Sequence, residues 1–155
     1  MINGGCRFTV YGQPKGKGRP RFRRLGKYTM TYTPKETVDY ENKVKESFLR
    51  DVGNHFNQLN GPIIADINCY CPIPKSISKK KKLEMENSPC LVKPDLDNIE
   101  KSILDPLNKI AYGDDAQVFK IDGAKFYSSN PRVDVTIKEY EKKIIKPIRF
   151  EGDNI

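Results

Sequence analysis

Residues 94–121 read PDLDNIEKSILDPLNKIAYGDDAQVFKI, and this pattern sets the architecture expected of the chain. Apolar residues recur there at helical spacing, which predicts a helix over residues 97–110. The inward side of that helix would carry Ile99, Ile103, Leu107 and Ile110. A capping box at Asp97 would begin the helix. Because proline removes one backbone hydrogen bond, Pro106 predicts a kink or break near Asp105.

A second helix is predicted upstream. Thr33 and Glu36 have the spacing of a capping box, Pro34 suits the first helical position, and Gly53 marks the end. The apolar stripe expected on this helix comprises Val38, Val44, Phe48, Leu49 and Val52. The opposite side is heavily charged, so one face is expected to pack against the core.

Strands are expected on both sides of these helices. Residues 63–71 alternate apolar and polar side chains before two prolines, which predicts a half-buried strand. Residues 7–11 alternate more weakly and are expected to form an opening strand. Residues 119–127 and 132–140, joined by a Ser-Ser-Asn-Pro turn, predict a terminal hairpin.

The expected organisation is a single α+β domain over residues 1–141, with a mixed β-sheet and helices packed against it. Residues 12–27, rich in Gly, Pro, Lys and Arg, are expected to form a basic loop. Residues 76–86 allow either a short surface helix or a mobile basic loop. Residues 142–155 are expected to be a C-terminal tail or arm.

Positive charge is concentrated at the N-terminus. The formal net charge is +8, and the first 35 residues contain nine Lys or Arg but no Asp or Glu. Such a segment favours a polyanionic partner, which could be DNA, RNA or an acidic membrane surface. No stretch is long and apolar enough to span a bilayer, and the first residues do not resemble a secretory signal. A membrane is therefore the least favoured partner, and a cytoplasmic location is expected.

The cysteines offer little evidence of a metal or disulfide framework. They are Cys6, Cys69, Cys71 and Cys90, and the chain has no Cys-x-x-Cys motif and a single histidine. Reduced, partly buried thiols are favoured over a structural zinc site.

Candidate catalytic chemistry is concentrated in two clusters, which comprise Asp95, Asp97, Lys101, Asp114 and Asp115. Closely packed carboxylates repel one another, so they suggest a cationic ligand, and Mg²⁺ prefers such oxygen donors. If the turn with Asp115 returns to the helix start, a metal there could promote phosphodiester hydrolysis, with Lys101 beside the phosphate. Alternatively, these acids only cap a helix and a turn, for which Asp is common.

The run from Pro94 to Asp105, then Asn108 and the motif Asp-Asp-Ala-Gln-Val at 114–118, resembles the core motif of the RusA family of Holliday junction resolvases. Residues 17–22 and a Tyr-Thr-Pro ahead of a helix are similar to the start of phage-type members. The resemblance implies a homodimeric endonuclease that cuts four-way DNA junctions by paired, symmetric nicks, with a role in DNA recombination and repair. It also implies Mg²⁺ as the cofactor, with Mn²⁺ as a candidate substitute and no small-molecule cofactor.

Carried over by position, the resemblance matches Asp95, Asp97 and Asp115 to the family's essential acids, which would bind the metal. Lys101 matches the essential lysine, and Asp114 matches an accompanying acid with an expected supporting part. The chain departs from the short bacterial form of the family at four places, so its substrate preference stays open. These are the longer basic loop, the lysine run at 79–82, Pro106 and the extended C-terminus.

The N-terminal bases are the candidate DNA contacts, with two aromatic residues between them. These bases are Lys15, Lys17, Arg19, Arg21, Arg23, Arg24 and Lys27. The alternative is a solvated arm that only raises solubility. A dimer would match the two-fold symmetry of a junction, and the first strand and the C-terminal extension are candidates for its interface.

Two other functions remain open. One is a broader structure-selective nuclease that acts on forks or flaps. The other is a non-catalytic nucleic-acid-binding module whose acids only cap helices, which predicts binding indifferent to Mg²⁺ and no nicks.

Overall fold

The computed structural model describes residues 4–142, so all but the first residue of the expected tail at 142–155 lies outside it. Its elements are β1 (Gly5–Tyr11), β2 (Arg21–Leu25), β3 (Tyr28–Tyr32), α1 (Lys35–Val52), β4 (Ile63–Pro72), α2 (Lys79–Met85), α3 (Leu96–Leu107), β5 (Val118–Ser128) and β6 (Arg132–Glu139). A single turn of 3₁₀ helix, Asp115–Gln117, precedes β5. The described part forms one α+β domain, as the sequence predicts.

The main sheet is mixed and has the strand order β1-β6-β4-β5. β4 pairs in parallel with β5, whereas β6 pairs antiparallel with both β4 and β1. The mixed sheet is therefore confirmed, but the predicted terminal hairpin is wrong. Both strands exist, yet β4 lies between them. β4 is buried along one complete face, and a central position gives it a partner on each side.

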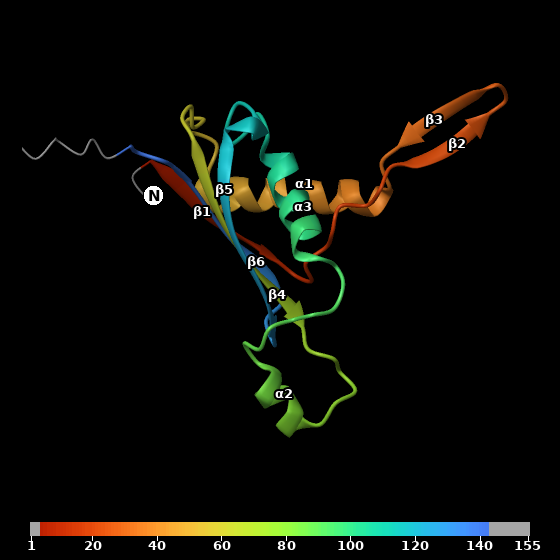
Figure 1. Ribbon diagram of the computed structural model, residues 1–155, viewed down its shortest axis with the longest axis vertical. Coiled ribbons are helices and arrows are strands. Elements are labelled where there is room, and N and C mark those ends of the chain that lie inside the picture. The colour runs from red at the N-terminus through yellow and green to blue at the C-terminus, as the bar shows by residue number, and fades with distance from the viewer. Residues whose placement is uncertain (1–3, 143–155) are drawn as a thin grey trace, which may run out of the picture.

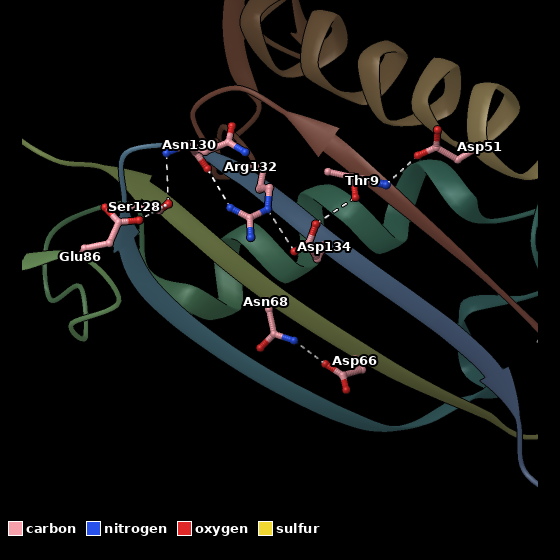
Figure 2. Close-up of polar contacts among 9 residues, drawn as sticks. All are labelled: Thr9, Asp51, Asp66, Asn68, Glu86, Ser128, Asn130, Arg132 and Asp134. Carbon is pink, nitrogen blue, oxygen red and sulfur yellow. Dashed lines mark hydrogen bonds and ion pairs between the residues drawn. The ribbon is translucent and has the colours of Figure 1, made fainter.

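Helices α1 and α3 cover one face of this sheet (Figure 1). The alternation predicted for residues 63–71 is confirmed, since Ile63, Ala65, Ile67 and Cys69 are fully buried. The other face of the sheet carries polar side chains, several of which bond to one another (Figure 2). The protein is thus a two-layer structure with one core between helices and sheet.

Helix α1 ends before Gly53, as predicted, but its start and its buried face differ from expectation. Pro34 is the residue before the helix, and no side chain caps it, so the capping box at Thr33 is wrong. The buried face comprises Thr37, Tyr40, Val44, Ser47 and Phe48. Val38 and Leu49 are exposed instead. Packing against both β1 and α3 selects a face centred on Val44, which the apolar pattern alone does not specify.

Helix α3 buries Ile99, Ile103 and Leu107 completely, which confirms the predicted stripe. Ile110 lies beyond the helix and is partly buried against the core. The helix starts after Asp95 without a side-chain cap, so the predicted capping box is wrong. Pro106 does not break it at the preceding residue, because the helix ends one residue later and little hydrogen bonding is lost.

The expected basic loop at residues 12–27 is partly wrong. Residues 13–20 contain no helix or strand, but Arg21–Leu25 and Tyr28–Tyr32 pair as an antiparallel hairpin. Gly26, with a φ of +61°, supplies the turn. Every residue of both strands is exposed, and the hairpin projects away from the sheet (Figure 1). Aromatic and Thr residues in these strands favour extended backbone despite the many bases.

Three further expectations can be compared with the structure. Of the alternatives for residues 76–86, the helix is correct, and Ser78 caps it by accepting a hydrogen bond from the Lys81 amide. All four cysteines are free and buried. No helix within residues 4–142 is long and apolar enough to cross a membrane.

Candidate active site

The N-terminal end of α3 is joined to the basic segment by backbone contacts. The Lys17 amide donates to the Asn98 carbonyl at 3.2 Å, and the Ser102 hydroxyl donates to the Lys15 carbonyl at 2.7 Å. Gly16 lies so close to Asn98 that an added Cβ would clash with it. Residues 13–20 are therefore held across the start of α3, next to the first acidic cluster.

A surface cavity of about 580 Å³ lies along this segment. Its lining includes the bases Lys15, Arg19 and Arg21, the acid Glu36, and Pro94. Pro94 is the residue immediately before Asp95. This cavity, with three basic residues in its lining, therefore extends to the residue before the first acid.

Asp95 is exposed and forms an ion pair with Lys93. The Lys93 ammonium donates to both carboxylate oxygens, at 2.7 and 2.6 Å. This hydrogen bonding lowers the pKa of Asp95 below its ordinary value. Asp95 is therefore ionised at neutral pH and accessible to a cation that displaces Lys93.

Asp97 and Lys101 are exposed on α3, one turn apart. Between them, Glu100 turns toward the sheet, where an added Cβ on Gly123 would clash with its carboxylate. Burial raises the pKa of Glu100, and the charge of Asp97 raises it further. Glu100 is thus a further acid beside Asp97.

Asp114 and Asp115 lie in the turn before β5, at the other end of α3. The pKa of Asp115 is raised by its hydrogen bond with Asp114 and by the charges of Asp114 and Asp105. The Ala116 amide donates to Asp114 at 3.1 Å and lowers the pKa of that carboxyl. Asp105 is in the last turn of α3, so Asp115 neighbours the C-terminal end of the helix.

The structure does not bring the three predicted metal ligands together in one protomer. Asp97 and Asp105 are about 12 Å apart along the helix axis at 1.5 Å per residue, and Asp115 lies on the Asp105 side. Across residues 4–142, no three Asp, Glu, His or Cys side chains gather closely enough to hold a metal ion. The expectation that Asp95, Asp97 and Asp115 share one ion is therefore not met within a single chain. Sequence spacing alone cannot fix the path of the turn between α3 and β5.

The predicted DNA contacts divide into three groups, and the first, Lys15 and Arg19, lines the surface cavity. Lys17 is partly buried and forms ion pairs with Asp105 and, at 3.5 Å, with Glu41. Although partial burial acts to lower the pKa of Lys17, these two carboxylates raise it above its ordinary value. The bases of the hairpin project into solvent, and they comprise Arg21, Arg23, Arg24 and Lys27. Lys17 therefore connects the basic segment to α1 through Glu41 and to α3 through Asp105.

Three residues near the acids were missed by sequence reasoning. Lys93 pairs with Asp95, Glu100 lies beside Asp97, and Lys125 donates to the Pro94 carbonyl at 2.7 Å. Lys93 and Glu100 could have been found, because each lies within three positions of a singled-out acid. Lys125 could not, since it reaches Pro94 from β5.

The α+β fold places exposed acids near a cavity lined by basic residues, and comparison with known proteins defines the class. Residues 11–138 match the family described as Endodeoxyribonuclease RusA. The chain is also 38% identical over 141 residues to the uncharacterized protein YqaN of Bacillus subtilis (strain 168), a match that covers 86% of this chain and 95% of that protein. The chain belongs to the RusA endodeoxyribonuclease family.

Proposed function

We propose that this protein is a Mg²⁺-dependent, homodimeric endodeoxyribonuclease that resolves four-way DNA junctions by paired, symmetric nicks. The observation that carries the proposal is a surface cavity lined by Lys15, Arg19 and Arg21 that extends to Pro94, the residue before exposed Asp95. Membership of the RusA family supports the reaction class. A role in recombination and repair follows from the proposed substrate.

The cavity and the hairpin are the proposed DNA-binding surface. Phosphate contacts from Lys and Arg supply affinity that does not depend on sequence and falls with salt. A two-stranded ribbon fits a DNA groove, and Phe22 and Tyr28 on the hairpin, 73% and 80% exposed, offer rings for stacking. Because residues 13–20 are bonded to α3, a phosphate strand bound there would lie beside Asp95 and Asp97.

Within the proposed site, Lys101 shares a helix face with Asp97 and can contact a phosphate oxygen there. The N-terminal end of α3 carries a partial positive charge, which favours phosphate at the same place. Both features would stabilise the negative charge that builds on a phosphate during hydrolysis.

The metal part of the proposal rests on donor chemistry. Exposed Asp carboxylates are ligands that Mg²⁺ prefers, and Mg²⁺ retains several waters, so it needs few protein ligands. Asp95 and Asp97 are the proposed ligands from α3, and Asp115 is the third, with Asp114 in support. One protomer does not supply this set. The set of ligands would be complete if the turn before β5 moved toward Asp97, or if a second copy supplied its Asp115. The proposed homodimer allows the second arrangement.

The test compares cleavage of a synthetic four-way junction, a fork and a linear duplex, with Mg²⁺ and with EDTA. The proposal expects Mg²⁺-dependent cuts in the junction, at symmetric positions in opposite strands, and much slower cutting of the other two. Equal cleavage of the fork would favour the broader structure-selective nuclease. Binding without any nick would favour the non-catalytic module.

A further inference from the structure

The lysine run at 79–82 is a motif that the proposed function does not use, and α2 divides it into two pairs. Lys79 and Lys82 share a helix face with Leu83 and Glu86, because residues at i, i+3, i+4 and i+7 align along a helix. The two intervening lysines lie on other sides of the helix. Helix α2 therefore gives equal charges in one short segment two different surroundings.

The face with Lys79 and Lys82 lines a surface cavity of about 630 Å³, which is also lined by the last residues of β4 and β5. The two intervening lysines are not part of its lining. The apolar part of the lining comprises Pro72, Ile73, Leu83 and Pro131. Leu83 is 72% exposed. An exposed apolar surface that is rimmed by polar residues is typical of a contact with another molecule.

The wall that α2 contributes is bonded to the sheet. The Glu86 carboxylate accepts a hydrogen bond from the Ser128 hydroxyl at 2.9 Å (Figure 2), and another from the Ser129 amide at 2.8 Å. These bonds, that from the Ser129 amide first, lower the pKa of Glu86 below its ordinary value. The Asn87 amide also donates to the Tyr127 carbonyl at 2.9 Å. The cavity is therefore a built feature, and its acid is already engaged.

The charge that remains free around the cavity is positive. Lys75, Lys79 and Lys82 line it, and among the ion pairs of residues 4–142 none involves these lysines. The acid in the lining, Glu86, is held by its two serine neighbours. Three lysines against one glutamate leave a positive excess, which favours a partner that carries negative charge.

The apolar lining distinguishes between the two kinds of anionic partner, a nucleic acid and an acidic peptide. A phosphate backbone supplies charge but no apolar group to pack against Ile73 and Leu83. The cavity beside residues 13–21 differs in this respect, because its lining contains no Ile or Leu. A peptide could place a large apolar side chain in the α2 cavity and its carboxylates beside the lysines, so it matches both features.

We propose that the α2 cavity binds an extended, acidic segment of a partner protein, with one large apolar side chain packed against Ile73 and Leu83. Carboxylates on both sides of that side chain pair with Lys79 and Lys82. Helix α2 projects beyond the end of the sheet, and the hairpin projects from a different part of the body (Figure 1). A partner bound at α2 therefore leaves the hairpin free for DNA.

The probe is a fluorescein-labelled peptide with the sequence Gly-Asp-Asp-Phe-Asp-Asp-Gly, titrated with the full-length protein at low salt and read by fluorescence anisotropy. Saturable binding is expected. Serine in place of Phe, or asparagine in place of every Asp, should weaken binding at least about tenfold. The proposal is overturned if binding does not saturate up to about 300 μM protein, or if either control peptide binds as tightly as the probe.

Two double variants of α2 form a matched pair. Lys79→Gln with Lys82→Gln changes the cavity, whereas Lys80→Gln with Lys81→Gln removes the same charge away from it. Helix α2 buries no residue, so both variants should fold as the wild type does. The first should weaken the probe at least about tenfold and the second less than about twofold. Equal weakening would show attraction to the lysine run as a whole and would overturn the proposal.

A variant of the apolar lining tests the packed side chain. Leu83→Ser should weaken the Phe-containing probe at least about fivefold and leave the Ser-containing peptide unchanged. Because Leu83 is mostly exposed, the fold should not depend on it. Unchanged affinity of this variant for the probe would overturn the apolar contact on which the proposal depends.

Competition identifies other occupants of the cavity. A saturating four-way junction in EDTA should leave the probe bound, whereas its displacement would assign the cavity to nucleic acid and overturn the proposal. The sequence of residues 149–155 also combines a Phe with two acids. A peptide of that sequence that binds at least about tenfold more tightly than the probe would assign the cavity to the chain itself, which would likewise overturn the proposal.

Discussion

Replacing the hairpin bases should change how DNA affinity depends on salt without changing the stability of the fold. The hairpin projects from the body and all its strand residues are exposed, so glutamine at Arg21, Arg23, Arg24 and Lys27 removes no packed contact. Each phosphate contact contributes about 0.9 to the slope of log affinity against log salt. The four replacements should therefore reduce the slope by about 3.6 per protomer.

The starting slope follows from which bases are free. Of the seven predicted contacts, Lys17 is engaged by Asp105 and Glu41. The other six give a slope of about −5.4 per protomer, and affinity should fall about 1,800-fold between 50 and 200 mM salt. The quadruple variant has a slope of about −1.8, and its affinity should fall only about 12-fold.

Fluorescence anisotropy of a labelled four-way junction, titrated in EDTA at several salt concentrations, measures both slopes. Lys17→Gln is the control, because it should leave the slope nearly unchanged while it lowers the melting temperature through loss of the ion pairs. A quadruple variant whose slope matches wild type would refute the assignment of the hairpin as a DNA contact. A Lys17 variant with a slope reduced by about 0.9 would refute the internal role of Lys17.

Three further changes address the site, the core and the sheet edge. Asp97→Asn should abolish cleavage of a four-way junction. The dissociation constant of the variant for the same junction in EDTA should stay within about threefold of the wild-type value, since only one exposed charge is altered. If the variant cleaves at the wild-type rate, Asp97 is not part of the site. Ile103→Ala, at a fully buried position of α3, should lower the free energy of unfolding in urea by about 2–5 kcal/mol, and a loss under 1 kcal/mol would be inconsistent with that burial. Asp51→Ala removes a carboxylate whose pKa is lowered, chiefly by its hydrogen bonds from Arg50. The stabilisation that this carboxylate provides is therefore present above the unfolded-state pKa of about 3.9, and it is lost as the pH falls through the folded-state pKa. The variant should be about 1 kcal/mol less stable than wild type at pH 7 and equal to it near pH 2, and a difference that persists at pH 2 would contradict this linkage.

Features that depend on one buried face were predictable from sequence. Residues 63–71 alternate because one side of β4 faces the helices, and Ile99, Ile103 and Leu107 repeat because one side of α3 faces the sheet. In both segments, buried positions carry apolar residues, so the sequence itself indicates which face is buried. The cluster at Asp95 and Asp97 was predictable for the same reason, since local spacing places both at the start of one helix.

Features that depend on contacts between distant segments were not predictable. Nothing in residues 119–140 specifies that β4 lies between the last two strands, because strand pairing is decided by the whole sheet. The position of Asp115 near Asp105 depends on the path of the intervening turn. The engagement of Lys17 likewise requires α1 and α3 to be in place. Local charge patterns identify these residues but not their partners.

The measurement that tests the proposed activity most directly uses a supercoiled plasmid that extrudes a cruciform, which is a four-way junction in a closed circle. Paired, symmetric nicks in one binding event convert it to a linear product. The protein should yield linear DNA with Mg²⁺, none with EDTA, and none from Asp97→Asn. Open circles without linear DNA, or no cleavage by wild-type protein, would contradict the account.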